Sequence, residues 1–346
     1  MLLAKAGVKV DLYERSSSVG GRTSSLQQDG FKFDVGPTFF MYPQVLREIF
    51  HNCGFDLDRE VPMQRLDPQY RISFASGGHL DATPNVERME AEIAKFSPRD
   101  AHSLRRFLNE NREKLEAFKP VLQRPFNGWR DVMDPSLVKL LPLLRPTSSL
   151  DRDLGRYFED PRIRLAFSFQ SKYLGMSPFR CPSLFSILSF LEYEYGVFHP
   201  IGGCAAVCEK MAELATRLGV RIHTDEPVEQ LLFSGKRATG VRTSKRSENY
   251  ESVVINADFA HAMRKMVPDH LRRRWTNKKI AKKRFSCSTF MLYLGVEGEY
   301  GDVPHHTIHI SSDYAANLEQ VEKQKVLPSD PSFYVQNACV TDPSLA

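Results

Sequence analysis

The residue types best suited to chemistry in this chain lie within residues 8–38. The stretch VKVDLY ends at Glu14, and the pair Gly20-Gly21, followed by Arg22, comes shortly afterwards. A carboxylate at the end of a strand can accept hydrogen bonds from both hydroxyls of an adenosine ribose, because it offers only acceptors to two donors. The glycines permit a backbone approach that a Cβ would block, and Arg22 can donate to a phosphate or fix the loop. The pattern predicts a site for a dinucleotide, with FAD as the expected cofactor.

Each of these features also has an ordinary structural alternative. Glu14 alone could be a solvated acid at a strand end, and Gly20-Gly21 alone could form a plain turn. We expect the binding role because the acid, the glycines and the arginine occur together. The negative charge of Glu14 would repel a 2′-phosphate, so FAD or NAD is favoured over NADP.

The segment DGFKFDVGPT, residues 29–38, predicts a hairpin followed by an abrupt chain reversal at Gly36-Pro37. The reversal would bring the backbone close to something flat or bulky, and beside a nucleotide the flavin ring is a candidate. Phe31 and Phe33 alternate with polar residues, so we interpret them as strand residues that face the core. Asp34 is expected to brace the loop or to stabilise a turn.

A dinucleotide unit of this kind normally begins with a strand and a G-x-G-x-x-G turn, and here both would lie before Met1. The opening LLAKAG predicts the last turns of the helix that follows such a turn, with Gly7 as its C-cap. We therefore expect the sequence to start late.

The composition is that of a globular protein. The chain has 346 residues, 42% hydrophobic and 26% charged, which leaves room for about two domains and excludes disordered and fibrous classes. It shows neither the roughly 20 consecutive apolar residues of a spanning helix nor a secretory signal. Six scattered cysteines without a C-x-x-C pair suit a reducing compartment, so we expect a cytoplasmic location. The formal charge of +5 suits an anionic membrane surface or nucleic acid but establishes neither.

The local patterns predict an α/β fold in four parts. Residues 1–75 mix short strands with glycine turns and are expected to form the first part of the cofactor domain, without its first strand. Residues 76–195 are mainly helical, and residues 196–262 return to the cofactor domain. Residues 263–346 are expected to form an incomplete, sheet-containing substrate domain.

Several element boundaries follow from local signals. Ser97 is expected to cap a helix that has Pro98 at its first position. After a helix in CAAVCEKMAELATRLG and a strand in VRIH, a hairpin with Gly235 at its turn is expected, followed by a strand that runs into Asn256. STFMLYLGV, residues 288–296, is a further strand candidate.

Taken together, the motifs GVKVDLYERSSSVGGRTSS, DGFKFDVGPT, GVFHPIGG, VVINAD and DPSFYVQNACVTDPSLA resemble the bacterial and fungal-type phytoene desaturase family, flavoproteins of the amine-oxidase-like superfamily. The resemblance covers nearly the entire chain. It implies a discontinuous Rossmann-like FAD-binding domain with a sheet-containing substrate domain and a mainly helical insertion that contacts the membrane. It also implies that a long polyene is oxidised by hydride transfer to FAD, and that quinone or oxygen reoxidises the flavin.

The resemblance assigns cofactor-binding residues by position: the ribose-binding acid is Glu14, the pyrophosphate-side GGR is Gly20, Gly21 and Arg22, the ring-side pair is Gly36 and Pro37, the P-x-G-G turn is Pro200, Gly202 and Gly203, and the adenine-side strand begins near Val228. The sequence departs from the family by lacking the first glycine-rich turn and by stopping at TDPSLA, before another flavin-binding segment. We expect the 346-residue product to be unstable or unable to retain FAD unless the gene is longer.

No residue is assigned as a catalytic base. For desaturation, the protein mainly has to align the substrate and provide a dry apolar channel beside the flavin. Glu192, Glu194 and His199 lie near GVFHPIGG, but each is expected to be a structural or surface residue.

Other constellations are expected to be structural. Strand alternation would send His305 and His306 to opposite faces, so no metal site is expected there, even with His309 nearby. Cys204 and Cys208 share one helix face, where packed thiols are commoner than redox pairs. The basic run from Arg272 to Lys283 includes Trp275 and Ile280 and suits a solvated helix, so no nucleic-acid partner is expected.

A membrane surface is an expected partner, because a carotenoid precursor is almost insoluble in water. Residues 118–146 supply Phe118, Phe126, Trp129 and a leucine cluster among basic residues. Peripheral membrane attachment and a lid over the protein's own substrate channel are both open interpretations of this stretch.

Two further functional hypotheses remain beside desaturation. A carotenoid or retinoid isomerase or saturase of the same build would use the flavin in its reduced form. A truncated and inactive remnant would only bind membrane or a partner.

Overall fold

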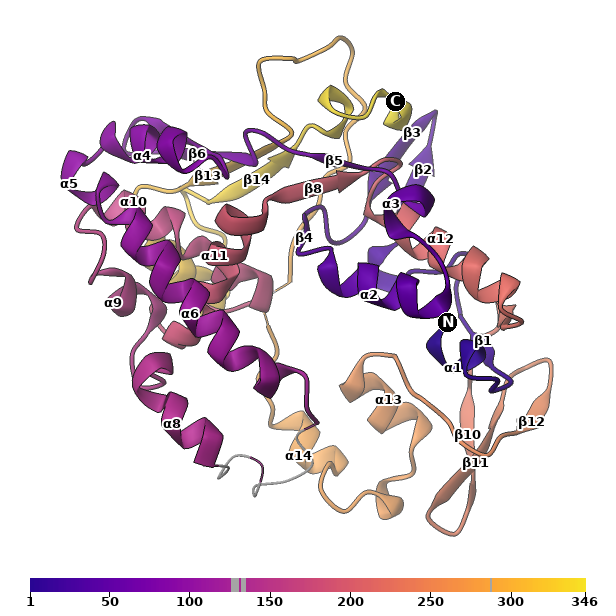
Figure 1. The fold of residues 1–346 in the computed structure, drawn as a ribbon. Helices are drawn as coiled ribbons and strands as arrows, with labels where there is room; N and C mark the ends of the chain where they lie inside the picture. The colour runs from indigo at the N-terminus through magenta and orange to yellow at the C-terminus, as the bar shows by residue number, and fades with distance from the viewer. Residues whose placement is uncertain (126–130, 132–134, 287) are drawn as a thin grey trace.

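The computed structural model of this chain describes residues 1–125, 131, 135–286 and 288–346. The fold is mixed α/β, with small sheets flanked by helices (Figure 1). The helical group that contains α4 (Val86–Ala94), α6 (Leu104–Leu122) and α11 (Ser186–Tyr195) lies on one side, and α2 (Gln44–Cys53) and α12 (Cys204–Arg217) lie on the other.

The N-terminal segment follows the predicted order of helix, strand and hairpin. Helix α1 (Leu2–Lys5) has Ala6 as its C-cap, so the predicted C-cap at Gly7 is wrong by one residue, and Gly7 follows with a φ of 85°. Strand β1 (Asp11–Tyr13) is shorter than predicted and pairs in parallel with β9 (Arg221–His223). These two strands join segments that are far apart in the sequence.

Two predicted hairpins are confirmed. Strands β2 (Ser25–Gln28) and β3 (Phe31–Asp34) are antiparallel, and both turn residues, Asp29 and Gly30, have positive φ. Strands β10 (Gln230–Ser234) and β11 (Arg237–Arg242) turn at Gly235, and β12 (Ser247–Asn249) extends their sheet. Positive φ at the turn matches the right-handed twist of the paired strands.

Two further sheets join distant parts of the chain. One has the order β14 (Phe333–Gln336), β13 (His306–Ile310), β6 (Tyr70–Phe74) and β7 (His79–Ala82), with β13 parallel to β6. The other has the order β4 (Phe40–Met41), β8 (Val197–Pro200) and β5 (Met63–Arg65). The expected domain boundary near residue 75 thus falls between two paired strands, and the boundaries themselves stay predictions.

Helices occupy much of residues 86–195, as predicted, and the hydroxyl of Ser97 accepts the backbone N–H of Asp100 at 3.2 Å. In the described parts of the chain, the other α-helices are α3 (Leu57–Glu60), α5 (Pro98–Ala101), α8 (Pro135–Leu144), α9 (Leu150–Leu154), α10 (Pro161–Ala166), α13 (Phe259–Met266), α14 (Asn277–Ala281) and α15 (Tyr314–Glu319).

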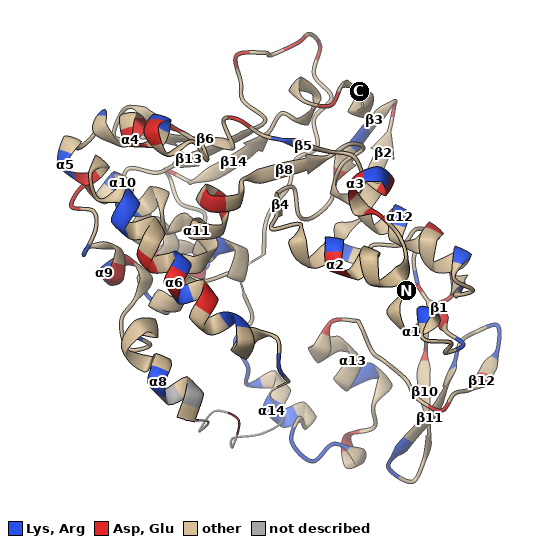
Figure 2. Cartoon of the chain, viewed as in Figure 1, with Lys and Arg blue, Asp and Glu red and all other residues tan. Residues whose placement is uncertain are grey.

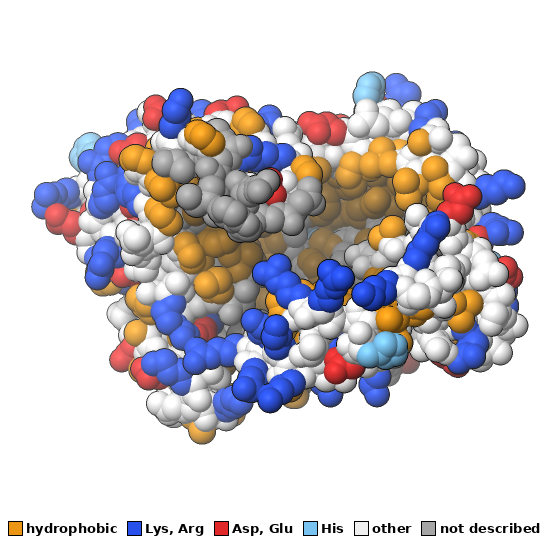
Figure 3. Space-filling view, turned by 90° about the horizontal axis from the view of Figure 1, so that it is seen from below, with side chains coloured by type: hydrophobic (Ala, Val, Ile, Leu, Met, Phe, Trp, Pro, Cys, Tyr) orange, Lys and Arg blue, Asp and Glu red, His pale blue; other side chains and the backbone are white. Residues whose placement is uncertain are grey.

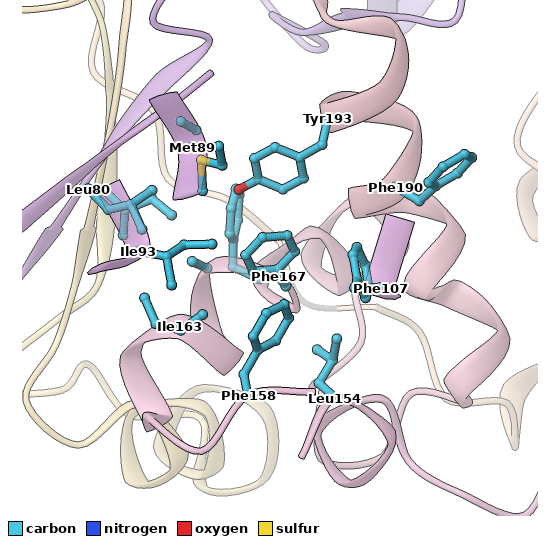
Figure 4. Close-up of a cluster of buried hydrophobic side chains, with 14 of the residues drawn as sticks. Leu80, Met89, Ile93, Phe107, Leu154, Phe158, Ile163, Phe167, Phe190 and Tyr193 are labelled. Carbon is cyan, nitrogen blue, oxygen red and sulfur yellow. The ribbon is translucent and has the colours of Figure 1, made fainter. Parts of the chain in front are cut away.

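The main hydrophobic core lies among these helices and the four-stranded sheet. Phe167 is fully buried and stacks on Phe158 and Tyr193 at centroid distances of 4.7 and 4.6 Å. Figure 4 shows these rings with Phe107 and Ile163, which come from α6 and α10. Such stacked and edge-on aromatic contacts add to the free energy gained by burial.

Two predicted strands are wrong. In the described parts of the chain, no strand pairing includes residues 252–256 or 288–296. Several of their apolar residues are instead open to solvent, with Val254 81% and Phe290 89% exposed. Alternation favours a strand, but a strand forms only where another backbone lies beside it to complete the ladder.

Candidate functional site

Glu14 lies at the carboxyl end of β1, where the sequence predicts a ribose-binding acid. Its N–H donates to the carbonyl of His223 at 2.9 Å, and its carbonyl accepts the N–H of Glu226 at 3.0 Å. Its Oε1 accepts the backbone N–H of Ser16 at 2.9 Å. These contacts fix a half-buried carboxylate at the end of the parallel pair.

The GGR loop forms a short 3-10 turn over Gly21–Thr23. Gly20 has a φ of 105°, and a Cβ there would lie 2.8 Å from the carbonyl oxygen of Thr23. A Cβ on Gly21 would meet no atom within 4 Å, so its backbone faces open space. The exposed guanidinium of Arg22 lies 3.4 Å from the carboxylate of Asp258, which is a weak surface ion pair.

The structure brings the two predicted cofactor loops into direct contact. A Cβ on Gly36 would lie 1.9 Å from the carbonyl oxygen of Arg22, so the two backbones meet where only glycine fits. The N–H of Val35 also donates to the carbonyl of Ser24 at 3.0 Å. The loop of Gly36 and Pro37 is thereby fixed against the GGR loop.

The P-x-G-G turn follows β8, which ends at Pro200, and two distant carboxylates hold it. Asp342 accepts the N–H of Gly202 at 2.7 Å. Asp34 accepts the N–H groups of Cys204 and Ala205 at 2.9 and 3.2 Å, and burial raises its pKa. Asp34 therefore braces the first turn of α12, which the sequence did not reveal, and occupies N–H groups that a phosphate would otherwise use.

A Cβ on Gly203 would lie 2.8 Å from Asp34 Oδ1, so this glycine makes room for the carboxylate. Val228 lies half-buried between β9 and β10, two residues after Glu226, and β10 itself begins at Gln230. The backbone contact from Glu226 to Glu14 brings the start of the predicted adenine-side segment beside the predicted ribose site.

A pocket of about 340 Å³ opens beside these loops. Thr23 of the GGR turn and Pro37 of the second loop form part of its wall. The other lining residues are apolar, aromatic or thiol side chains: Phe39, Phe40, Tyr42, Val45, Leu46, Ile49, Cys204, Val207 and Cys208. No charged side chain lines the pocket, so it suits a flat or elongated apolar group.

The residues present fit an adenine dinucleotide that carries a flat aromatic ring system. Glu14 offers an acceptor at the strand end, the open backbone at Gly21 allows close approach, and the pocket beside Pro37 offers an apolar surface.

Cys204 and Cys208 both line this pocket. Burial raises the pKa of each thiol. Both groups are therefore protonated near neutral pH, and the sequence-based interpretation of packed thiols agrees with this environment.

Glu192 and Glu194 are the two acids that the sequence analysis weighed as a catalytic base, and Glu192 is fully buried. Its Oε2 accepts hydrogen bonds from Tyr70 and Gln170, both at 2.8 Å, and its Oε1 accepts one from Tyr173 at 2.9 Å. Burial raises the pKa of Glu192 to about 7, although these three hydrogen bonds lower it. Glu194 instead pairs with Arg112 at 2.7 Å.

Phe39 stands between the pocket and this carboxylate. Its ring lines the pocket and lies 6.0 and 5.8 Å from the rings of Tyr70 and Tyr173. Among the described residues, no hydrogen bond joins Glu192 to a residue that lines the pocket, so its geometry favours a structural role. The ring of Phe39 also stacks on the ring of His306, with 4.0 Å between the ring centroids.

The prediction that His305 and His306 point to opposite faces is wrong. Their ring centroids are 4.3 Å apart, because His305 precedes the first residue of β13 and is not bound to strand alternation. His199 lies 4.6 Å from His305, and all three rings are buried. His309 stacks separately on Phe333. Among the described residues, no group of three or more His, Cys, Asp and Glu side chains is arranged to hold a metal ion.

Sequence reasoning missed this histidine cluster. The only local signal was the pair His305-His306, and its contact with His199 depends on the packing of β8 near β13, more than a hundred residues away. Burial lowers the pKa of His305 to about 3 and that of His306 well below its usual value, so both rings are neutral at ordinary pH.

The face that carries α8, α13 and α14 is hollowed. Figure 3 shows hydrophobic side chains inside the hollow and Lys and Arg along its edge, and Figure 2 shows basic residues on and around α14. Within the basic run, the cation Arg272 and the apolar Ile280 are buried. The other Lys and Arg side chains of the run are exposed. Leu122, Leu141 and Phe285 are 60%, 46% and 67% exposed.

Phe126 and Trp129, which the sequence analysis placed in the membrane-contacting stretch, lie outside the described residues. In the part of the chain that is described, none of the helices has the length and hydropathy to span a bilayer.

Comparison with known proteins gives a consistent result. The model of the family described as "Flavin containing amine oxidoreductase" matches residues 2–298. The chain is 37% identical to a 4,4'-diapophytoene desaturase (4,4'-diapolycopene-forming) from Methylomonas sp, over 100% of this chain and 68% of that protein. It is 36% identical to an all-trans-zeta-carotene desaturase from Myxococcus xanthus, over 99% of this chain and 66% of that protein. The chain thus spans about two thirds of the length of these relatives.

The chain is also similar to the crystal structure of the PF1083 protein from Pyrococcus furiosus. The TM-score is 0.58, over 99% of this chain and 72% of that one. At 15% sequence identity this likeness shows the fold alone.

Gly36→Ala is expected to lower the free energy of unfolding by about 1–3 kcal/mol, because its Cβ would meet a backbone oxygen that cannot rotate away. Gly301→Ala is the control, since a Cβ there meets no atom within 4 Å. Gly301→Ala should change the free energy of unfolding by less than about 1 kcal/mol. Urea denaturation measures both, and equal stabilities of the two variants would contradict the contact between the loops.

Glu192→Gln is expected to change the pH dependence of stability. A pKa raised from 4.5 to about 7 favours the protonated form in the fold, so the contribution of Glu192 is present below pH 4.5 and is lost as pH rises through 7. The loss amounts to about 3 kcal/mol. The variant cannot ionise, so its stability relative to the natural chain should increase between pH 5 and pH 8.

Thermal unfolding across this pH range measures the effect, with Glu194→Gln as the matched control on the same helix. If the difference in unfolding free energy between the Glu192 variant and the natural chain stayed constant with pH, the shifted pKa of Glu192 would be contradicted.

Proposed function

Because the chain belongs to the flavin-containing amine oxidoreductases and, within them, to the carotenoid desaturases, we propose that it uses FAD to desaturate a carotenoid precursor such as phytoene. The observation that carries this proposal is the apolar pocket, because its wall combines residues of both predicted flavin loops with aromatic side chains. A polyene needs such a surface, since it offers no polar groups for recognition.

In this proposal, the chain's residues bind and orient the cofactor. Glu14 accepts hydrogen bonds from the ribose, the backbone at Gly20 and Gly21 faces the pyrophosphate, and the loop of Gly36 and Pro37 lies beside the ring. FAD, when bound, supplies a hydride acceptor. The apolar pocket aligns the polyene and excludes water from the reacting bond.

The proposed substrate class rests on the relatives. Their names include 4,4'-diapophytoene desaturase, all-trans-zeta-carotene desaturase and, in Cereibacter sphaeroides, phytoene desaturase (neurosporene-forming). All of these names describe long polyenes and their desaturation. We propose a substrate of the same class, with quinone or oxygen as the acceptor that reoxidises the flavin.

We also propose that the chain attaches peripherally to a membrane, on its cytoplasmic side. Figure 3 shows apolar side chains in the hollow and Lys and Arg along its edge. Leu141 of α8 and Phe285 are exposed, as are the cations of residues 273–284 around α14. This combination suits anionic headgroups around an entry for an apolar substrate.

Glu14→Gln is expected to weaken FAD binding by at least about tenfold, because a neutral amide is a poorer acceptor for two ribose hydroxyls than a carboxylate. Glu248→Gln, which changes an exposed acid of β12, is the control and should bind FAD like the natural chain. Titration of FAD by flavin fluorescence measures both, and equal affinities would contradict the ribose assignment.

Incubation of the FAD-loaded chain with phytoene in lipid vesicles is expected to produce absorbance bands at longer wavelength, because desaturation lengthens the conjugated system. An altered double-bond geometry with the same conjugation length would instead indicate an isomerase, and a shortened conjugation would indicate a saturase. Vesicle binding without flavin binding or conversion would indicate an inactive remnant. Each of these three outcomes would overturn the proposed desaturation.

A further inference from the structure

Glu226 is a buried acid that lies next to the predicted ribose site. It follows the end of β9, and its side chain is 2% exposed. A carboxylate is seldom buried unless it is paired. Sequence analysis assigned no role to this residue, so its burial calls for an explanation from its contacts.

Two residues of one turn hold the carboxylate of Glu226. The hydroxyl of Thr243 donates to Oε1 at 2.8 Å. The guanidinium of Arg246 contacts both oxygens, with Nε 2.9 Å from Oε1 and Nη2 3.1 Å from Oε2. Burial raises the pKa of Glu226, but the Thr243 hydroxyl and Arg246 lower it by more, so the pKa lies below its ordinary value and the group is charged at neutral pH. A two-pronged contact between a guanidinium and a carboxylate fixes both distance and angle.

The turn that holds Glu226 connects β11 to β12 and is itself hydrogen-bonded. Thr243 follows the last residue of β11, and β12 begins at Ser247. The hydroxyl of Thr243 accepts the N–H groups of Lys245 and Arg246, both at 3.1 Å. The N–H of Thr243 donates to the carbonyl of Arg246 at 2.9 Å. These bonds keep the two partners of the Glu226 carboxylate in place relative to each other.

The sheet that carries this turn is also fixed to β1. The sheet of β10, β11 and β12 lies beside β1 (Figure 1), and the hydroxyls of Tyr13 and Tyr250 are 2.8 Å apart. The ring of Tyr13 stacks on that of His223, with 4.8 Å between the ring centroids. The turn is therefore a firm anchor beside the strand that ends at Glu14.

The backbone around Glu226 holds the residues that carry the predicted ribose site. The N–H of Glu226 donates to the carbonyl of Glu14 at 3.0 Å, and the N–H of Asp225 donates to the carbonyl of Ser16 at 2.9 Å. The N–H of Ser16 in turn donates to Glu14 Oε1 at 2.9 Å. Glu226 therefore contacts the Glu14 backbone through its N–H and the anchoring turn through its carboxylate.

We propose that Glu226 is a positioning residue for the cofactor, which keeps the Glu14 carboxylate in place for the ribose hydroxyls through its contacts with Thr243 and Arg246. The inference rests on the proposed function, since it takes the bound group to be FAD. Glu226 does not touch the cofactor and acts through the backbone of Glu14. A displaced Glu14 binds the ribose less well, because a hydrogen bond weakens steeply as its distance and angle depart from their best values.

The test combines Glu226→Gln with Glu14→Gln in a double-mutant cycle. Glu226→Gln keeps the shape of the side chain, but its amide has one acceptor oxygen and no charge to pair with Arg246. We expect it to weaken FAD binding by at least about fivefold in the natural chain and by less than about twofold in the Glu14→Gln chain, because residues that act through one another are not additive. Titration of FAD by flavin fluorescence measures the four affinities, and equal losses in the two chains would overturn the proposal.

Two further variants support the cycle. Arg246→Gln removes the same ion pair from a side chain that is 39% exposed, so we expect it to fold and to reproduce the loss seen in Glu226→Gln. Glu248→Gln changes an exposed acid of the same sheet and should bind FAD within about twofold of the natural chain. An Arg246→Gln chain that binds FAD like the natural chain would also overturn the proposal.

Amide hydrogen exchange, followed by NMR without FAD, gives a second readout. In Glu226→Gln, the N–H of Asp225, which bonds to the Ser16 carbonyl, should exchange at least about fivefold faster. The N–H of Arg221, which bonds to the Val10 carbonyl where β1 and β9 pair, should stay within about twofold. Unchanged exchange at Asp225, or equal acceleration at both sites, would overturn the proposal. A natural chain that binds no FAD would refute the proposed function, whereas exchange would still decide whether Glu226 holds this backbone.

Discussion

The arrangement of the site depends on two carboxylates that hold one turn. Asp34 accepts the first N–H groups of α12, and Asp342 accepts the N–H of Gly202 in the turn before it. Hydrogen bonds from backbone N–H groups to a carboxylate are among the stronger ones in proteins. Because Asp34 ends β3 and Asp342 lies near the C-terminus, this turn joins three segments that are far apart in the sequence.

The other features of the site follow from this junction. With β3 fixed against α12, the loop that continues from it to Gly36 and Pro37 meets the GGR loop and lines one pocket with Cys204. With Asp342 fixed against the same turn, His199 lies against His305 in the cluster of buried histidines. One backbone turn thus places both the pocket and the three buried histidines.

The features that sequence analysis predicted are those with local causes. Asp29-Gly30 and Gly235 determine hairpin turns through positive φ, and Ser97 with Pro98 determines a helix start. The resemblance to carotenoid desaturases, which rested on short motifs across the chain, is confirmed by relatives that match its whole length. The assigned cofactor-binding residues remain predictions, although the structure brings the loops of Arg22 and Gly36 together.

The features that sequence analysis missed have non-local causes. The histidine cluster depends on β8 and the start of β13 meeting in space, and the role of Asp34 depends on a helix 170 positions away in the sequence. The two wrong strands, residues 252–256 and 288–296, have the hydrophobic pattern of strands but no paired neighbour in the described chain. A pattern of side chains determines which face is apolar, but pairing depends on the backbone that lies beside it.

The central claim is that these loops hold an adenine dinucleotide with its ring system toward the apolar pocket. A crystal structure of the chain grown with FAD tests it most directly. The account predicts ribose hydroxyls within hydrogen-bond distance of the Glu14 carboxylate and a ring system against Pro37. Flavin density at another site, with Glu14 left facing solvent, would contradict it.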